Sequence, residues 1–343
     1  MAKITVGLDI GFSTIKVVAL QHGSDLPKLT AIGSIASPVP GMASDGDQDL
    51  SMVAGSIKKL LDASKLQQKE VIVALPESKV FTRVIDDLPY LTSSELSSAI
   101  HYASEEFIPL PMKEVNLNWQ VLFQGKQKTD RTVVFVVASP KQVVQKYIRL
   151  LGMAGLKPKA LETEIIASSR ALVSDNPFSP TSLIIQMGTA TTDFAIVSKG
   201  LILLTRSIAT GGSALTRALA QHFSFEMTQA EEYKKVYGLL TDQMEGKVYE
   251  ALHPVIDAIM EETRRVIEAF HTKNPTNRIK RVVVSGGGAK MPGLVVYLAN
   301  NLNLEVQEAD PWYFITQDTA FKAKLIQEGP LYTIAVGLAL WEP

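Results

Sequence analysis

The sequence VGLDIGFSTIKVVAL at Val6–Leu20 decides the fold, because it has the pattern of two strands joined by a short glycine turn. Apolar residues predict strands at Ile4–Ile10 and Ile15–Leu20, on either side of a Gly-Phe-Ser-Thr turn. A glycine turn can bring backbone N–H groups against a phosphate, and the hydroxyls of Ser13 and Thr14 add further donors. Taken alone, this hairpin is as well explained by a plain structural turn as by a phosphate-binding loop.

The same pattern returns in the second half of the chain as LIIQMGTATTDFAIV at Leu183–Val197. Gly188 matches Gly11 and Thr191 matches Thr14, each 177 residues further on (188 − 11 and 191 − 14). This offset is close to half of the 343 residues, so the repeat predicts two related lobes that face each other. Two glycine hairpins on opposing lobes would grip one polyphosphate from both sides, which favours phosphate binding over two structural turns.

Charged and hydroxyl residues around the two hairpins are the candidates for phosphate and metal binding. Asp9 stands at the end of the first strand, where its carboxylate could hold Mg²⁺ through waters and take part in catalysis. Lys16 lies on the return strand and could reach a phosphate oxygen. The candidate phosphate-binding residues are Gly11, Ser13, Thr14, Lys16, Gly188, Thr191, Thr192, Gly211 and Gly212.

A third glycine-rich segment, VVVSGGGAKMPG at Val282–Gly293, predicts a buried strand, a turn and a helix start. Three consecutive glycines cost conformational entropy, so we expect a base or ribose to lie closely against this turn. The segment lacks the third glycine of the dinucleotide fingerprint, and the chain has no GxxxxGK[ST] phosphate loop. Residues 231 and 234 could bind ribose hydroxyls from one helical face, although a surface ion pair is the better explanation of that spacing alone. The candidate nucleoside-binding residues are Gly286, Gly287, Gly288, Glu231 and Lys234.

The composition is that of an ordinary globular protein and excludes several classes of function. A chain of 343 residues exceeds the size at which one core keeps growing, so two or more lobes are expected. The net charge of -1 gives no support for attraction to nucleic acid or anionic lipid, and the absence of cysteine excludes disulfides and thiolate metal sites. The five histidines lack metal-ligand spacing. No apolar run is long enough for a signal peptide or a membrane span, so we expect no direct membrane insertion.

The order of predicted elements divides the chain into four parts. Strand, helix, hairpin, helix and strand follow one another at 77–160, which predicts a small α+β unit inserted into the first lobe. Polar residues at 125–131 form the expected hairpin tip of this unit, and a loop rich in Pro and Ser at 175–181 precedes the second lobe. The expected parts are a first-lobe core at 1–76 and 161–180 with a C-terminal helix at 330–343 packing back on it, the inserted subdomain at 77–160, a second-lobe core at 181–212 and 275–329, and a helical subdomain at 213–274.

In this order and over essentially the whole chain, these segments resemble the actin-like ATPase superfamily. The resemblance implies a two-lobed α/β fold of the ribonuclease H-like type that binds ATP or ADP with Mg²⁺. Glu164, which follows the inserted unit, would be the residue nearest to the water that attacks the γ-phosphate. The matching segments are Asp9–Lys16 and Gln186–Thr192 as the two phosphate motifs, Ser285–Gly288 as the adenosine motif, Glu231 and Lys234 on the ribose-contacting helix, and Ile165–Leu172 and Ile334–Leu340 as the helices that connect the lobes.

The inserted unit narrows the resemblance to one branch of this superfamily. Actin and the heat-shock chaperones carry their extra subdomain elsewhere, whereas the families of the cell-division protein FtsA and the type IV pilus assembly protein PilM share a unit of this kind. FtsA-like proteins add a linker and an amphipathic membrane helix after the last connecting helix, and with the sequence ending at Trp341–Pro343 we expect no such anchor. The phrases that resemble the PilM family are FIPLP at Phe107–Pro111, GGGAKMPGL at Gly286–Leu294, ADPW at Ala309–Trp312 and AVGLAL at Ala335–Leu340.

Likeness to the PilM family implies a cytoplasmic ATP-binding component of a pilus machine, held at the inner membrane by a partner. The cytoplasmic tail of a bitopic membrane protein, PilN, would dock in a groove between the first lobe and the inserted subdomain. Pilus motor ATPases and further copies of the chain are additional partners that this resemblance allows. Two alternatives stay open: a filament-forming, FtsA-like ATPase, and an active kinase related to sugar kinases, for which no aspartate stands out as the general base.

One position departs from the family pattern. The second phosphate motif commonly carries an acidic residue where this chain has Gln186. A neutral amide coordinates a cation only weakly and indirectly, and it lacks a full charge near Mg²⁺ and the attacking water. Because electrostatic positioning dominates phosphoryl transfer, we expect tight nucleotide binding with slow or no hydrolysis.

Overall fold

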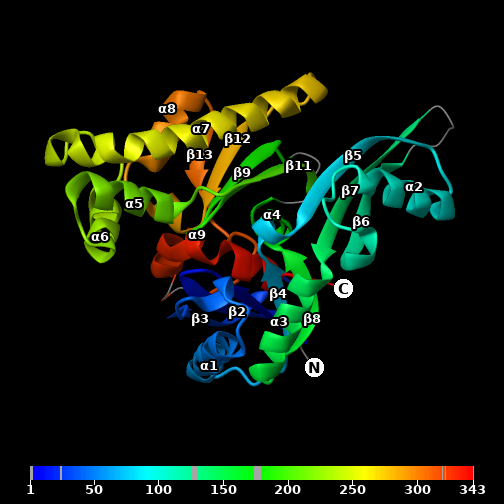
Figure 1. Ribbon diagram of the computed structural model, residues 1–343, viewed down its shortest axis with the longest axis horizontal. Coiled ribbons are helices and arrows are strands. Elements are labelled where there is room, and N and C mark those ends of the chain that lie inside the picture. The colour runs from blue at the N-terminus through cyan, green and yellow to red at the C-terminus, as the bar shows by residue number, and fades with distance from the viewer. Residues whose placement is uncertain are drawn as a thin grey trace.

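The computed structural model describes residues 3–23, 25–124, 130–173, 179–318, 320 and 322–342. The expected hairpin tip at 125–131 and the expected loop at 175–181 lie largely outside these residues. Within them, the chain forms two five-stranded sheets and one three-stranded sheet, with helices between and around the sheets (Figure 1). Each of the two larger sheets contains one of the predicted glycine hairpins.

The first sheet has the strand order β3-β2-β1-β4-β8. An antiparallel meander of β1 (Lys3–Ile10), β2 (Thr14–His22) and β3 (Lys28–Ala36) forms one side. On the other side, β4 (Glu70–Leu75) pairs parallel with β1, and β8 (Lys157–Thr163) pairs parallel with β4. Parallel strands need crossover connections, and helices supply them here.

The second sheet repeats this topology, with the strand order β11-β10-β9-β12-β13. Here β9 (Ser182–Met187), β10 (Thr192–Ser198) and β11 (Leu201–Ile208) form the antiparallel meander. Two parallel strands, β12 (Arg281–Ser285) and β13 (Glu305–Glu308), complete the sheet next to β9. The position of each strand relative to the hairpin is therefore the same in both sheets.

The register of the two hairpins is also the same. In the first, β1 and β2 place Asp9 opposite Lys16, and in the second, β9 and β10 place Gln186 opposite Asp193. These positions differ by the offset of the sequence repeat, 177 residues (186 − 9 and 193 − 16). The predicted pair of related lobes is confirmed down to the pairing of individual residues.

Helices cover both faces of the first sheet. On one face, α1 (Asp47–Ala63) and α3 (Lys141–Met153) pack against β1 and β2 in a shared apolar core. On the other face lies α9 (Lys322–Ala339), whose apolar residues contact the alternate residues of β2 and β4. Strands buried on both faces explain the nearly continuous apolar runs that the sequence shows there.

Two helices, α4 (Glu164–Leu172) and α9, lie between the larger sheets (Figure 1). They cross at Gly337, where a Cβ atom would overlap the carbonyl oxygen of Ala167. Arg170 fixes this crossing, because it donates to the carbonyl of Gly337 at 2.7 Å and forms a bidentate pair with Glu162 at 2.7 and 2.8 Å. The crossing therefore joins the two lobes through close backbone contact and one oriented guanidinium.

The second sheet is covered by four helices, α5 (Gly212–Phe223), α6 (Met227–Tyr237), α7 (Lys247–Lys273) and α8 (Leu294–Leu302). The longest of them, α7, runs along the top of the molecule in Figure 1. Over the described ranges, no helix is both long and apolar enough to cross a membrane. Short 3₁₀ helices occur at Gly41–Ala43, Glu77–Lys79, Met112–Glu114, Met244–Gly246 and Gly287–Lys290.

The inserted unit consists of β5 (Phe81–Pro89), β6 (Val115–Gln124) and β7 (Arg131–Pro140) in the order β5-β7-β6, with α2 (Ser93–Glu105) packed on one face. Thr92 caps α2 in a capping box with Glu95. The opposite face of the sheet shares an apolar core with α4 and the second sheet. The unit thus touches both lobes.

Two expected boundaries need correction, while the division into four subdomains stays a prediction. The range 77–160 assigned α3 and most of β8 to the inserted unit, but β8 pairs with β4 and α3 packs in the first-lobe core. The C-terminal helix begins at Lys322 rather than at 330. A proline normally ends a helix, yet Pro330 lies inside α9, where its carbonyl accepts the N–H of Gly286 at 2.8 Å.

Candidate functional site

The two glycine hairpins have the same turn geometry. The N–H of Gly11 donates to the carbonyl of Thr14 at 3.1 Å, and the N–H of Gly188 donates to that of Thr191 at 2.9 Å. A Cβ atom at Gly11 would lie 2.8 Å from the carbonyl oxygen of Thr14, so this turn requires glycine. Both predicted turns are therefore tight.

The tips of the two hairpins touch each other. The hydroxyl oxygen of Ser13 lies 2.8 Å from that of Thr189, within hydrogen-bond distance. These residues belong to different sheets and are 176 positions apart in the sequence. The lobes are closed at this point, and a polyphosphate could enter between the hairpins only if the tips moved apart.

Behind the first hairpin, Asp9 and Lys16 form the charged pair that the register predicts. The Nζ of Lys16 lies 3.4 Å from Oδ2 of Asp9, and both side chains are largely buried. Burial keeps this pair from being screened by solvent. Lys16 thus lies beside the first turn with its charge compensated by one carboxylate.

Behind the second hairpin lies a buried carboxylate that the sequence reasoning missed, Asp193. Its oxygens accept hydrogen bonds from the hydroxyls of Ser207 and Thr191. On the facing strand, Gln186 is also buried and accepts a hydrogen bond from Ser168 on α4 at 3.3 Å. The sequence repeat could have revealed Asp193 as a candidate site residue, because the offset of 177 residues aligns it with Lys16 (193 − 177).

Two glutamates complete a group of four acids, which we term the carboxylate cluster: Asp9, Glu77 and Asp193, which are buried, and Glu164, which is partly buried. Glu77 follows the end of β4 and was also missed, while Glu164 begins α4 as expected. The two are linked reciprocally: the N–H of Glu77 donates to Glu164 at 3.3 Å, and the N–H of Ile165 donates to Glu77 at 3.5 Å. Glu162, in contrast, is occupied by Arg170.

Burial and mutual repulsion shift the acidity of this cluster. Burial, followed by the charge of Asp193, raises the pKa of Glu77 to about 7. Burial, followed by the charges of Asp193 and Asp9, raises the pKa of Glu164 well above its usual range. Burial likewise raises the pKa of Asp193 to about 6, against the two hydroxyl donors. The cluster therefore holds protons at neutral pH that a cation could replace.

The chemistry of these donors fits Mg²⁺ held through water. Carboxylate and amide oxygens are the ligands that Mg²⁺ prefers, and the ion usually keeps several of its waters. In the part of the chain that the structure describes, no three acidic or histidine side chains converge closely enough to ligate a metal directly. The expected indirect roles of Asp9 and Gln186 are compatible with this arrangement and stay a prediction.

The start of α5 is attached to the second hairpin. The N–H of Gly212 donates to the carbonyl of Gly188 at 2.9 Å, and the hydroxyl of Thr192 donates to the carbonyl of Thr210 at 2.7 Å. A Cβ atom at Gly211 would lie 2.7 Å from the carbonyl oxygen of Gly188, so only glycine permits this approach. The structure thus brings Thr192, Gly211 and Gly212 together at the site.

The predicted pair on α6 is formed and also faces this point. Nζ of Lys234 donates to Glu231 at 2.6 Å, to the hydroxyl of Thr216 at 2.8 Å and to the carbonyl of Gly212 at 3.0 Å. The pair is therefore more than a surface ion pair, because it ties α6 to the first turn of α5. Its expected contact with a ribose stays a prediction.

The three consecutive glycines have a structural explanation that the sequence reasoning did not foresee. Gly286 has φ of 82°, and a Cβ atom there would overlap the carbonyl oxygen of Met187. At Gly288, a Cβ atom would overlap the side chain of Met187. A Cβ atom at Gly287 would fit without strain, because its nearest neighbour, the side chain of Leu331, would lie 3.8 Å away. Close packing on β9 therefore accounts for two of the three glycines without any ligand.

Comparison with known proteins gives the family of this chain. The family model of the type IV pilus assembly protein PilM matches residues 7–342. The chain belongs to the PilM family. Among solved structures, the PilM-PilN type IV pilus biogenesis complex has 28% sequence identity and a TM-score of 0.85, covering 99% of both chains.

More distant relatives place the PilM-type fold in a wider group. Cell division protein FtsA of Bacillus subtilis (strain 168) is 21% identical and covers 98% of this chain and 82% of its own length. FtsA of Escherichia coli (strain K12) is 22% identical, with 98% and 89% covered. MreB5 of Spiroplasma citri bound to AMPPNP has 16% identity and a TM-score of 0.55, with 100% and 96% covered. The predicted actin-like α/β fold of the FtsA-like branch is confirmed.

The Glu77→Gln substitution tests the carboxylate cluster through the pH dependence of unfolding. Because folding raises the pKa of Glu77 from 4.5 to about 7, the stability it contributes is complete below pH 4.5 and lost as the pH rises through 7. The glutamine variant stays neutral at every pH. We expect its free energy of unfolding to match the wild type near pH 4.5 and to exceed it at about pH 8 by on the order of 2 kcal/mol.

Urea unfolding at several pH values measures this difference. The control is Glu105→Gln, which removes a carboxylate that is exposed on α2. We expect its free energy of unfolding to follow the wild type at all pH values. A Glu77→Gln variant that gains no stability between the two pH values would show that Glu77 is ionised in the native protein.

Proposed function

We propose that this PilM-family chain is a nucleotide-gated binding protein of the type IV pilus assembly machinery. It binds ATP or ADP with Mg²⁺ between its two hairpins, and it docks the cytoplasmic tail of a PilN-type membrane protein. The observation that carries the proposal is the contact of Ser13 with Thr189, at 2.8 Å, directly in front of the carboxylate cluster. Two equivalent turns that meet at one point form a clamp for one polyphosphate.

Nucleotide binding uses residues that the structure brings to this point. The hairpin amides and the hydroxyls of Ser13 and Thr189 donate to phosphate, and Lys16 supplies a positive charge. Glu231 and Lys234 contact the ribose from α6, and the turn at Gly287 borders the base. The structural likeness to MreB5, a protein solved with AMPPNP, supports a nucleotide site in this fold.

Mg²⁺, when bound, neutralises phosphate charge, and the carboxylate cluster holds its water shell. Hydrolysis is slow, because Gln186 carries no charge and the nearest substitute, Asp193, already accepts hydrogen bonds from two hydroxyls. Glu164 orients a water only when ionised, and burial opposes its ionisation. The residues of this chain therefore favour retention of the nucleotide over its turnover.

Exchange of the two residues that face each other on β9 and β10 tests this proposal. The double variant Gln186→Asp/Asp193→Asn keeps the number of carboxylates but moves one to the strand end before the second turn. We expect Mg-ATP to bind the wild type with measurable heat and little phosphate release, and the double variant to release phosphate about tenfold faster. Calorimetry and a phosphate-release assay measure the two effects.

The control is the single variant Asp193→Asn, which lowers the carboxylate count without restoring an acid on β9. It should bind Mg-ATP more weakly than the wild type and release phosphate no faster. Absence of any heat with Mg-ATP in the wild type would contradict nucleotide binding. Unchanged phosphate release in the double variant would contradict the role given to Gln186.

The tail of the membrane partner fits a second feature, a groove of about 490 Å³ between the first lobe and the inserted sheet. Most of its lining residues are apolar, beside the polar Gln120, Ser169 and Arg170, and they come from the first lobe, the inserted sheet and the second lobe. The residues concerned are Leu26 and Leu340 beside the first sheet, Ile166 and Val173 along and beyond α4, Phe135 on β7 and Ile202 on β11. An extended apolar peptide would be enclosed on several sides. The likeness to a PilM-PilN complex supports PilN as the occupant.

A single helix links the groove to the nucleotide site. Glu164, the first residue of α4, belongs to the carboxylate cluster, while Ile166, Ser169 and Arg170 of the same helix line the groove. Arg170 also holds the crossing with α9. Nucleotide that parts the hairpins would move α4 against its neighbours and change the groove, so nucleotide acts as a conformational ligand.

The substitution Leu26→Asp tests the groove without disturbing the core, because 56% of this side chain is exposed. A charge there should weaken binding of a synthetic PilN-type tail peptide at least about tenfold, as measured by fluorescence anisotropy. The control is Val296→Asp on α8. This side chain is 63% exposed and does not line the groove. Equal affinity of both variants would place the tail elsewhere.

Through such a partner, the chain would be held at the inner membrane on the cytoplasmic side. Pilus motor ATPases and further copies of the chain stay predictions as additional partners. Both would have to reach surfaces outside the groove, because a bound tail would fill it. The outer face of the second lobe offers one such surface.

A further inference from the structure

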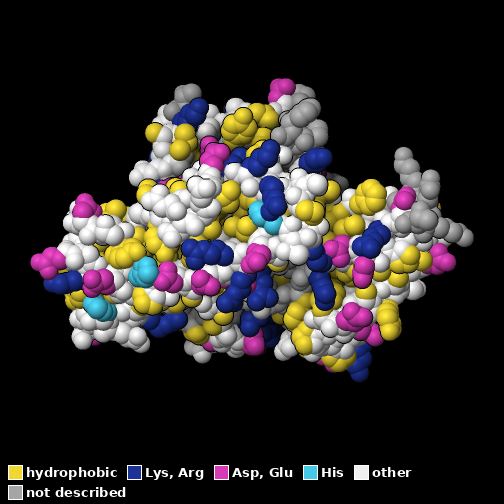
Figure 2. Space-filling model, turned by 90° about the horizontal axis from the view of Figure 1, so that it is seen from above, with side chains coloured by type: hydrophobic (Ala, Val, Ile, Leu, Met, Phe, Trp, Pro, Cys, Tyr) yellow, Lys and Arg dark blue, Asp and Glu magenta, His cyan; other side chains and the backbone are white. Residues whose placement is uncertain are grey.

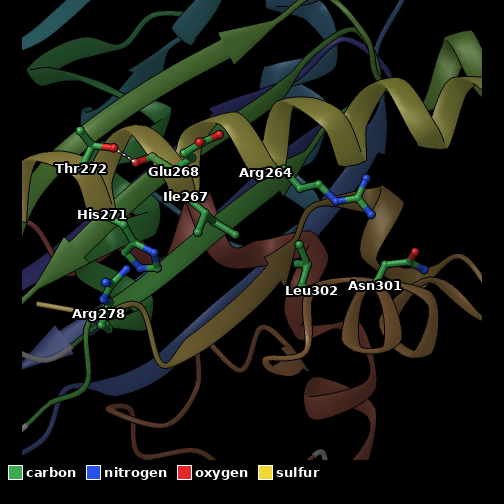
Figure 3. Close-up of a pocket in the computed structure, with 8 residues that line it drawn as sticks. All are labelled: Arg264, Ile267, Glu268, His271, Thr272, Arg278, Asn301 and Leu302. Atoms are coloured by element: carbon green, nitrogen blue, oxygen red, sulfur yellow. Dashed lines mark hydrogen bonds between the residues drawn. The ribbon is translucent and has the colours of Figure 1, made fainter. Parts of the chain in front are cut away.

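A second cavity, of about 570 Å³, lies on the outer face of the second lobe, between α7, α8 and the loop at 274–280. Figure 3 shows how its side chains are arranged. His271 and Arg278 lie together at one end, Arg264 lies at the other end, and Ile267 and Leu302 lie between them. The cavity thus combines two cationic ends with an apolar middle, and it lies outside both the hairpin clamp and the tail groove.

Arg278 is the strongest anion receptor in this cavity. Its guanidinium has no carboxylate partner within 4.0 Å among the residues that the structure describes. Arg264, in contrast, already forms an exposed pair with Glu261 at 3.3 Å. An unpaired guanidinium presents a planar fork that matches a carboxylate in a bidentate manner. The Arg278 end is therefore the place where an anionic group would bind.

His271 adds a neutral donor beside Arg278. Its Nε2 accepts the backbone N–H of Ile279 at 3.2 Å, which leaves the proton of the neutral ring on Nδ1. Burial, followed by the charge of Arg278, lowers the pKa of His271, so the ring stays uncharged at neutral pH. With Glu268 on the same wall, the cavity carries a single net positive charge from its two arginines and one glutamate.

This charge selects a monoanion over a dianion. A phosphate group would meet the negative charge of Glu268, and it would favour a protonated His271, which the bond from Ile279 opposes. A carboxylate needs only the guanidinium and one N–H donor. Apolar neighbours of that carboxylate would cover Ile267 and Leu302, whose side chains are partly exposed in the middle of the cavity.

We propose that this cavity binds an acidic residue flanked by apolar residues in a peptide segment of a partner protein. Figure 2 looks down on this side of the molecule, and Lys and Arg side chains gather in the middle of the face. Exposed basic residues of α7 and the following loop are Arg264, Arg265, Lys273, Arg278 and Lys280. Arg264, Arg265 and Lys273 pair with Glu261, Glu262 and Asp86, respectively. Arg278 and Lys280 have no carboxylate partner within 4.0 Å among the described residues, so their charges attract an acidic segment before the specific contact forms.

An array of short immobilised peptides tests the proposal. The central residue is Asp, Glu, Asn, Gln or phosphoserine, and the flanking residues vary among apolar types. We expect the labelled full-length protein to be retained on Asp and Glu peptides at least about tenfold more than on their Asn and Gln counterparts. The Arg278→Ala variant should lose this preference, whereas Lys280→Ala, which removes a nearby exposed charge outside the cavity, should keep it.

Thermal unfolding of Arg278→Ala checks that the exposed substitution leaves the fold intact, and Arg278→Lys shows whether charge alone suffices. Retention of Asp and Glu peptides by Arg278→Ala at the wild-type level would overturn the proposal. Stronger retention on phosphoserine peptides would overturn the choice of a carboxylate. A wild type that does not distinguish Asp from Asn peptides would show that the cavity is no acidic-peptide site.

Discussion

Repulsion among four carboxylates, three of them buried and one partly buried, is the constraint on which the closed arrangement of the two lobes depends. Asp9 and Asp193 belong to the hairpins of the two sheets, and Glu77 and Glu164 lie at the ends of β4 and β8. Only Asp9 has a cationic partner in the described structure, and three of the four acids have raised pKa values. Buried like charges cost several kcal/mol unless protons or a cation compensate them. The closed lobes therefore hold a set of acids that a hydrated cation would stabilise.

The same constraint explains how the ends of the molecule could communicate. The carboxylate cluster includes the first residue of α4, and α4 crosses α9 at a glycine that leaves no free space. A tight crossing cannot deform gradually, so separation of the hairpins would move these helices as units. The groove proposed for the partner's tail is lined by α4 and by the inserted sheet, so this movement would change its shape. In the proposed function, the nucleotide site and the groove would thus be coupled through α4.

Much of this arrangement could be read from the sequence, because the repeat is encoded locally. The offset of 177 residues, derived from Gly11 and Gly188, also gives the strand register that pairs Asp9 with Lys16 and Gln186 with Asp193. Helices other than α9 followed from apolar spacing in the sequence. Three strands, β3, β11 and β13, were not predicted, because each is an edge strand of its sheet with mixed polarity or few residues. Burial on one face only leaves a weak pattern in the sequence.

Other features depend on contacts between distant segments, which local patterns do not contain. The C-terminal helix was expected to begin at 330, yet α9 begins at Lys322 and contains Pro330, whose carbonyl accepts the N–H of Gly286. The glycine run at Gly286–Gly288 looks like a ligand loop, yet Met187 explains two of its members. Glu77 was overlooked for the same reason, since only tertiary structure places it against Glu164.

In the proposed function, the two hairpins must part to admit a polyphosphate, and a cross-link between their tips would prevent this movement. The chain contains no cysteine, so Ser13→Cys/Thr189→Cys introduces a single specific cross-link between side chains whose oxygens are 2.8 Å apart. Calorimetry with Mg-ATP is then carried out on the oxidised and the reduced protein. If the hairpins must part, the oxidised form will bind no nucleotide and reduction will restore binding. Equal binding by both forms would contradict this requirement.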